Sequence, residues 1–122
     1  MLFEQELSDK VLGCAFEVYN TLGNGFLEKV YEEALLIELE SKNIKAESQK
    51  EIKVYYKNNL VGEYLADIIV EEKIILELKS CSTINDAHVA QLLNYLTATG
   101  IKIGYLLNFG KAGILQYKRI VK

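Results

Sequence analysis

Residues 66–79 read ADIIVEEKIILELK, and the alternation within this stretch decides the predicted fold. Two runs with an apolar residue at every second position are typical of paired strands that bury one face. These positions are Ala66, Ile68 and Val70 in the first run and Ile74, Leu76 and Leu78 in the second. Both sets enter one core only if Val70 lies opposite Ile74, because a slip of one residue would turn one set to the other face. This register predicts a loop at residues 71–73 and places Asp67 opposite Glu77.

The other face of the same two strands carries charged side chains. Lys79 follows Glu77 by two residues, so Asp67, Glu77 and Lys79 are expected to cluster. Neighbouring carboxylates repel each other unless a cation joins them, and Mg²⁺ prefers oxygen ligands. Asp67 and Glu77 are therefore candidate metal ligands, with the backbone carbonyl of Leu78 as a third. Lys79 is a candidate to orient or deprotonate an attacking water and to offset charge on a phosphate.

A simpler interpretation of these charged residues stays open. Half-exposed sheets often carry a solvated cross-strand ion pair beside a spare acid, and such a pair needs no metal. The pattern D…ExK is common and, taken by itself, favours this simpler interpretation. The rest of the sequence has to decide between the two.

Apolar spacing predicts helices and strands on both sides of this stretch. Ser8 or Asp9 is expected to cap the first helix and Gly100 to end the last one. In the second helix the inward positions are expected to be Val30, Ala34, Leu35 and Leu39. The predicted helices cover residues 8–22, 27–41 and 86–99, and the predicted strands cover residues 52–56, 60–70, 73–79, 101–108 and 114–121. The order ααβββαββ indicates an α/β (α+β) fold with a mixed β-sheet flanked by helices.

Length and composition predict one domain over residues 1–122, because 122 residues with 50% hydrophobic content can bury a single core. No apolar run reaches the length of a membrane span, and the first residues lack the features of a signal peptide. A cytoplasmic protein without a membrane partner is therefore expected. The net charge of −3 argues against a protein that coats nucleic acid without selectivity.

The C-terminal part of the chain is basic despite the acidic total. Residues 101–122 contain five lysines or arginines and no acid. Lys118 and Arg119 are therefore candidates for contact with a nucleic-acid backbone. Solvated lysines that keep an edge strand from pairing with another molecule explain the same strip equally well.

Several spaced motifs resemble those of one protein family. They are Gly25-x-x-Glu28-x-x-Tyr31, Ala66-Asp67, Glu77-x-Lys79 and Gln91-x-x-x-Tyr95. In this order they resemble the GxxExxY protein family, a branch of the PD-(D/E)XK nuclease superfamily, and the resemblance covers nearly the whole chain. It implies a restriction-endonuclease-like core of the order αβββαβ. Ala66 stands where the superfamily's name has a proline.

The resemblance also implies roles for individual residues. Glu28 would join Asp67 and Glu77 around the metal, directly or through water, and Lys79 would be the catalytic lysine. Gln91 with Tyr95 looks like the QxxxY element of RecB-like and lambda-exonuclease-like relatives, where it lines the site; here Gln91 would steady Lys79 or a phosphate. Glu28 precedes Tyr31 by three residues, so its side chain is expected to point inward. A hydrogen bond from Tyr31 or a backbone amide is the alternative explanation for such an acid.

Two more side chains are candidates for the rim of the site. His88 lies near the start of the last predicted helix, where a rim position is expected and a phosphate contact is the functional alternative. Tyr95 is expected to pack in the core and to reach the rim with its hydroxyl. Together with Lys118 and Arg119 they form the candidate substrate contacts.

Together with these residues, the resemblance implies Mg²⁺-dependent hydrolysis of phosphodiester bonds, with DNA as the expected substrate and Mn²⁺ as the alternative ion. A catalytically inactive nuclease-fold module that binds nucleic acid or a protein partner stays open as the second hypothesis. A homodimer is the third, with Phe16, Phe26 and Phe109 as candidate contact residues.

Overall fold

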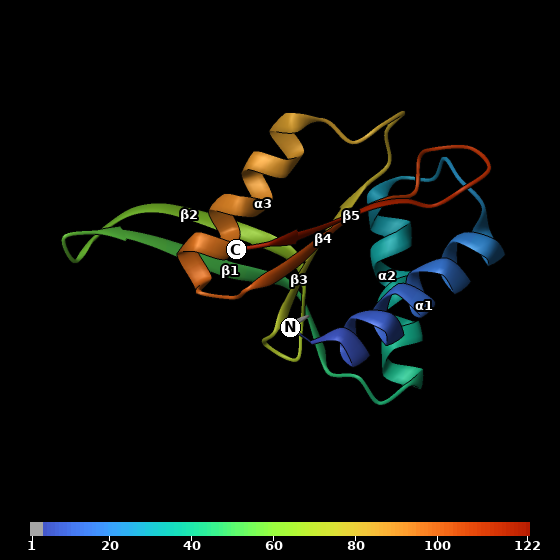
Figure 1. Ribbon diagram of the computed structural model, residues 1–122, viewed down its shortest axis with the longest axis horizontal. Helices are drawn as coiled ribbons and strands as arrows, with labels where there is room; N and C mark the ends of the chain where they lie inside the picture. The colour runs from blue at the N-terminus through green and yellow to red at the C-terminus, as the bar shows by residue number, and fades with distance from the viewer. Residues whose placement is uncertain (1–3) are drawn as a thin grey trace.

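The structure is a computed structural model that describes residues 4–122 (Figure 1). Its elements follow the expected order of two helices, three strands, one helix and two strands. The helices are α1 (Gln5–Leu22), α2 (Glu28–Ser41) and α3 (Asp86–Thr99), and the strands are β1 (Ala46–Tyr56), β2 (Asn59–Val70), β3 (Ile74–Lys79), β4 (Ile103–Asn108) and β5 (Gln116–Val121). The predicted fold class is thereby confirmed.

The five strands form one mixed sheet in the order β1-β2-β3-β4-β5. Strands β3 and β4 are parallel and α3 connects them, whereas the other neighbours are antiparallel. Helices α1 and α2 cover one face and α3 covers the other, while the far end of the β1–β2 hairpin extends beyond the helices (Figure 1). Each face of the sheet therefore has its own core.

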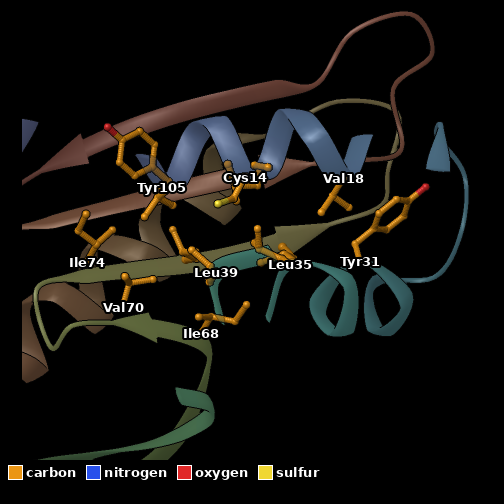
Figure 2. Packing of buried hydrophobic residues seen from close by; sticks show 14 of the residues in the cluster. Cys14, Val18, Tyr31, Leu35, Leu39, Ile68, Val70, Ile74 and Tyr105 are labelled. Atoms are coloured by element: carbon orange, nitrogen blue, oxygen red, sulfur yellow. The ribbon is translucent and has the colours of Figure 1, made fainter. Parts of the chain in front are cut away.

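The register of β2 and β3 agrees with the alternation of residues 66–79. Val70 lies opposite Ile74, and Ile68 lies opposite Leu76. The inward side chains from Ile68 to Leu78 pack with α1 and α2 in one buried cluster, in which Figure 2 labels Ile68, Val70 and Ile74. Ala66, which was expected in the same core, packs instead in the cluster on the α3 face, because the ladder between β1 and β2 is interrupted at Gln49 between the pairs of Ile68 and Ala66. The connecting loop has no glycine, yet Glu71 and Glu72 adopt φ of 53° and 56°. The backbone of Lys45 stabilises this turn, since its N–H donates to the Glu71 carboxylate at 2.7 Å.

The start of α1 differs from the prediction. The helix begins at Gln5, and no side chain caps it. Ser8 is fully buried and lies inside the helix, on the same face as Val11 and Ala15. Packing of this face extends the helix beyond the expected cap at Ser8 or Asp9.

The orientation of α2 also differs from the prediction at its first turn. Val30 is 40% exposed, whereas Tyr31, Leu35 and Leu39 are fully buried. Residues 27–30 are all exposed, so the helix meets the rest of the protein only from Tyr31 onward. Positions assigned inward from spacing alone are therefore wrong in the turn that overhangs the core.

The glycine and tyrosine of the GxxExxY segment have structural roles. Tyr31 is fully buried, its hydroxyl donates to the carbonyl of Gly23 at 2.6 Å, and it accepts a hydrogen bond from the N–H of Phe26 at 3.1 Å. Its ring stacks on Phe109 with 4.4 Å between the ring centroids. Gly25 adopts φ of 102°, which few other residues tolerate. Because Phe109 is fully buried, it is not available as the expected dimer contact.

Candidate functional site

Strands β2 and β3 separate at Asp67 and Glu77. The last paired residues before this point are Ile68 and Leu76. Beyond them, side-chain carboxylates accept hydrogen bonds from the backbone of the opposite strand. The N–H of Asp67 donates to Glu77 Oε2 at 2.8 Å, and the N–H of Leu78 donates to Asp67 Oδ2 at 2.8 Å. The expected juxtaposition of Asp67 and Glu77 is thus present, with each carboxylate bound to the backbone of the opposite strand.

Burial and mutual repulsion make this pair of carboxylates hard to ionise. Glu77 is only 4% exposed, and burial followed by the charge of Asp67 raises the pKa of Glu77 to about 8. Burial also raises the pKa of Asp67, although the hydrogen bond from the Leu78 N–H opposes that rise. Lys79 lowers the pKa of both acids. The pair therefore carries an electrostatic strain that a bound cation would relieve.

The buried acid on α2 is Glu32. It is 4% exposed, and its charge contributes to the raised pKa of both Asp67 and Glu77. Glu28 is exposed in the overhanging first turn, so the expectation of an inward-facing Glu28 is wrong. The sequence interpretation missed Glu32, although Glu32 lies three residues before the buried Leu35 and seven before Leu39, which is the spacing of an inward position.

Lys79 ends β3 on the same sheet face as Glu77. It is half-buried, and its carbonyl accepts a hydrogen bond from the N–H of Phe109 at 2.8 Å, which fixes the backbone there. Its charge lowers the pKa of Asp67, Glu77 and His88. Lys79 therefore lies within electrostatic reach of the acidic pair and of the start of α3.

Helix α3 contributes Tyr95 to the surroundings of the acids. Tyr95 is 5% exposed, and burial, then Glu77 and Asp67, raise the pKa of its phenol. Its ring lies 5.6 Å from that of Tyr64, which is 49% exposed. Gln91 lies one turn earlier on α3 and is exposed. The structure thus brings Tyr95 toward the acids and leaves Gln91 at the surface.

His88 is part of the cap of α3. Asn85 Oδ1 accepts a hydrogen bond from the N–H of His88 at 3.0 Å, and His88 Nδ1 accepts one from the N–H of Asn85 at 3.1 Å. The side chain is half-buried near the helix start, and its Nε2 is not used by the cap. The local role of His88 is therefore structural, and a substrate contact can involve only the second nitrogen.

The two basic candidates on β5 point to opposite faces of the sheet. Lys118 lies opposite Leu106, on the α3 side, and is exposed. Arg119 lies opposite Tyr105, and its guanidinium donates to the Tyr105 hydroxyl at 3.1 Å. Tyr105 packs in the α1 and α2 core, so the structure does not bring Arg119 to the face of Glu77 and Lys79.

Comparison with known proteins places this chain in a family. The family model described as the PD-(D/E)XK nuclease superfamily matches residues 5–120. The chain belongs to the PD-(D/E)XK nuclease superfamily. A search of curated proteins gave no match. The crystal structure of SSO0001 is similar to this chain, with a TM-score of 0.59 and 19% sequence identity over 78% of this chain and 50% of that one. This chain therefore spans half the length of that protein, and the likeness shows the fold.

Nucleases of the PD-(D/E)XK superfamily generally use divalent metal ions. Within residues 4–122, no three carboxylate, imidazole or thiol side chains lie close enough together to hold an ion. The Asp67 and Glu77 pair nevertheless has the right donor chemistry. One oxygen of each carboxylate accepts a backbone N–H, and each carboxylate has further lone pairs that could bind a metal ion. Oxygen donors with raised pKa values fit a hard cation such as Mg²⁺ or Mn²⁺.

No helix within residues 4–122 combines the length and the apolar character needed to cross a membrane.

Proposed function

We propose that this chain is a nuclease that hydrolyses phosphodiester bonds with a divalent metal ion, Mg²⁺ or alternatively Mn²⁺, and that DNA is its substrate. The observation that carries the proposal is the pair Asp67 and Glu77, which lies where β2 and β3 separate. Burial and mutual repulsion raise the pKa values of both groups. Membership of the nuclease superfamily supports the same reaction class.

Asp67, Glu77 and the carbonyl of Leu78 are the proposed ligands. In an antiparallel pair, the N–H and the C=O of one residue point toward the same neighbouring strand. The N–H of Leu78 points to Asp67, so its carbonyl also faces the gap between β2 and β3. Glu32 is the best placed further acid, directly or through water, because it is buried and electrostatically coupled to both carboxylates. Exposed Glu28 is the weaker candidate.

The bound ion would supply Lewis acidity and lower the pKa of a water molecule. The protein's own groups supply the rest. Asp67 and Glu77 fix the position of the positive charge, and Lys79 orients the attacking water and offsets charge that develops on the phosphate. Lys118 on the same face of the sheet and Nε2 of His88 are proposed contacts for the nucleic-acid backbone. The exposed Gln91 is free to approach substrate from α3.

Calorimetric titration of Mg²⁺ and Mn²⁺, followed by a cleavage screen on DNA substrates, tests the proposal. Binding and cleavage are expected for the wild type and are expected to disappear in the Asp67→Asn/Glu77→Gln double variant. The Glu17→Gln variant is the control, since it changes an exposed acid on α1 that is not a proposed ligand. A wild-type protein that binds neither ion and cleaves nothing contradicts the proposal.

Two observations favour a second function. The described acids do not enclose a ready-made ion site, and the net charge is −3. A non-catalytic module that binds nucleic acid or a protein partner is consistent with both facts. Binding of DNA that persists in excess chelator, without turnover in any divalent ion, distinguishes this alternative from the nuclease.

We also propose that the chain belongs to the GxxExxY branch of the superfamily. The structural roles of Gly25 and Tyr31 support this assignment, because both residues fix the segment that precedes and starts α2.

A further inference from the structure

Gln49 has a backbone conformation that is rare inside a strand. Its φ is 50°, in the left-handed region, although it lies in the middle of β1. The ladder between β1 and β2 pairs Ser48 with Ile68 and Lys50 with Ala66, but it does not pair Gln49 with Asp67. A residue that is neither glycine nor asparagine keeps this conformation only where its surroundings compensate for the strain.

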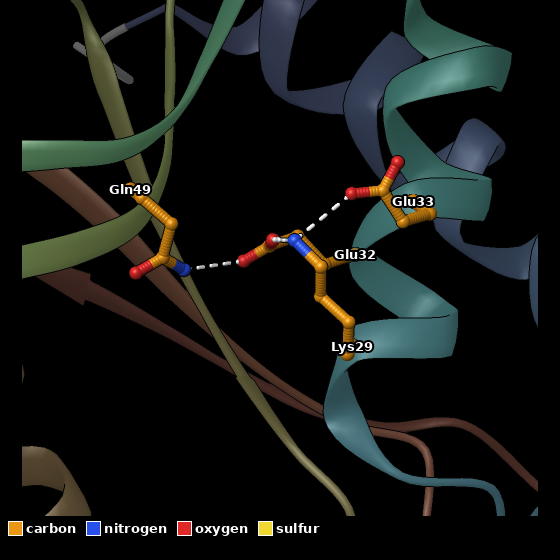
Figure 3. Close-up of polar contacts among 4 residues, drawn as sticks. All are labelled: Lys29, Glu32, Glu33 and Gln49. Carbon is orange, nitrogen blue, oxygen red and sulfur yellow. Dashed lines mark hydrogen bonds and ion pairs between the residues drawn. The ribbon is translucent and has the colours of Figure 1, made fainter.

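The compensation lies in the Gln49 side chain. Its Nε2 donates to Glu32 Oε1 at 2.7 Å, which joins the middle of β1 to α2 (Figure 3). Its amide also interacts with the Asp67 carboxylate and lowers the pKa of that group. Gln49 therefore lies between an acid from α2 and an acid from β2.

Lys29 is a second partner of the Glu32 carboxylate and competes with Gln49 for its position. Lys29 Nζ lies 3.0 Å from Glu32 Oε2 and 3.0 Å from Glu33, and its own side chain is 67% exposed (Figure 3). Repulsion from Asp67, and from Glu77 once that group is ionised, favours movement of Glu32 toward solvent, and so does attraction to the exposed Lys29. The Gln49 amide is the contact that opposes this movement.

We propose that Gln49 is a positioning residue, whose left-handed backbone directs its amide to hold the Glu32 carboxylate beside Asp67 and Glu77. Because no three acids within residues 4–122 lie close enough together to hold an ion, Glu32 would reach the divalent ion of the proposed nuclease through water. This inference rests on the proposed function, because it assigns Gln49 a role in binding that ion.

The Gln49→Gly variant separates the role of the amide from that of the backbone. Glycine adopts a positive φ without strain, and this gain offsets the loss of the hydrogen bond to buried Glu32, so the variant is expected to fold and to unfold at a temperature close to that of the wild type. Loss of a group that orients a ligand typically weakens metal binding by roughly 10- to 100-fold. We expect this loss in a Mn²⁺ titration followed by the electron paramagnetic resonance signal of the free ion. Gln49→Asn, which keeps an amide on a shorter side chain and tolerates the left-handed region, is expected to restore part of the affinity.

A double-variant cycle tests whether Gln49 acts through Glu32. Glu32→Gln is expected to weaken Mn²⁺ binding to a similar degree. The Gln49→Gly/Glu32→Gln protein is expected to show little further loss, because both substitutions remove the same interaction between Gln49 and Glu32. Unchanged affinity in Gln49→Gly, or additive losses in the double variant, overturns the inference while the nuclease proposal stands. A wild-type protein that does not bind Mn²⁺ overturns the proposed function itself and, with it, the role given to Gln49.

Discussion

Asp67 and Glu77 are joined through the backbone: the Glu77 carboxylate accepts the N–H of Asp67 at 2.8 Å. The Asp67 carboxylate in turn accepts the N–H of Leu78 at 2.8 Å. Two acids therefore occupy positions where a sheet would normally place carbonyl acceptors. The arrangement satisfies the backbone where β2 and β3 separate, and it keeps the carboxyl groups of half-buried Asp67 and buried Glu77 together.

The first prediction concerns the stability of the metal-free protein. The folded-state pKa of Glu77 is raised to about 8 from 4.5, so the folded protein binds more protons than the unfolded chain between these values. The free energy of unfolding should therefore fall as the pH rises from about 5 to about 8, at up to about 1.4 kcal/mol per pH unit. Urea unfolding in chelator at several pH values measures this slope.

Glu77→Gln should flatten that slope, because glutamine has no proton to lose and still accepts the hydrogen bond from the Asp67 N–H. The variant is expected to be more stable than the wild type at pH 8 in chelator. Glu28→Gln, at an exposed position, should leave the slope unchanged. Equal slopes for wild type and Glu77→Gln would contradict the raised pKa.

The second prediction concerns protons released on metal binding. At pH 7 the Glu77 carboxyl is mostly protonated when no metal is bound, because its pKa is about 8. A divalent ion needs the carboxylate, so binding should release close to one proton at pH 7 and almost none above pH 9. Calorimetric titrations of the metal in two buffers of different ionisation enthalpy give the number of protons released. The affinity should also rise between pH 6 and pH 9, and a pH-independent affinity would argue against Glu77 as a ligand.

The third prediction separates two acids that lie one turn apart on α2. Glu32→Gln should weaken metal binding and cleavage by roughly 10- to 100-fold, because it removes a buried acid coupled to the pair. Glu28→Gln should change neither quantity by more than about twofold, as expected for a solvated surface charge. Both variants remove one charge from the same helix, so each controls for the other. The reverse ranking would restore Glu28 as the ligand suggested by the motif.

The fourth prediction assigns Lys79 to the chemical step. Lys79→Met should lower the rate of cleavage at saturating metal by roughly 100- to 1,000-fold, the usual effect of removing a group that stabilises the transition state. Metal affinity should persist, because Asp67 and Glu77 remain. The variant should also raise the pKa of both acids further, since Lys79 lowers them in the wild type. A variant that cleaves at the wild-type rate excludes a catalytic role.

Some features of the fold follow from the sequence and others depend on packing. The register of β2 and β3 was predictable because apolar residues on both strands had to share one core, which allowed a single alignment. The inward positions Leu35 and Leu39 of α2 were also predictable from spacing, but the orientation of its first turn was not, because spacing cannot show that this turn extends beyond the core and leaves Glu28 in solvent. The left-handed Gln49 gave no signal, since only glycine or asparagine would mark such a position within a strand.

The last prediction tests the structural role of the GxxExxY tyrosine. Tyr31→Phe keeps the ring that stacks on Phe109 and removes only the hydroxyl. The carbonyl of Gly23 and the N–H of Phe26 then lose their shared partner, so the free energy of unfolding should fall by about 1 to 3 kcal/mol. Tyr55→Phe is the matched control, because Tyr55 is 59% exposed and its hydroxyl can be replaced by water. Metal affinity per folded molecule should stay at the wild-type value, since Tyr31 contacts the loop before α2 and not the acids; a loss of affinity without a loss of stability would instead place Tyr31 in the site.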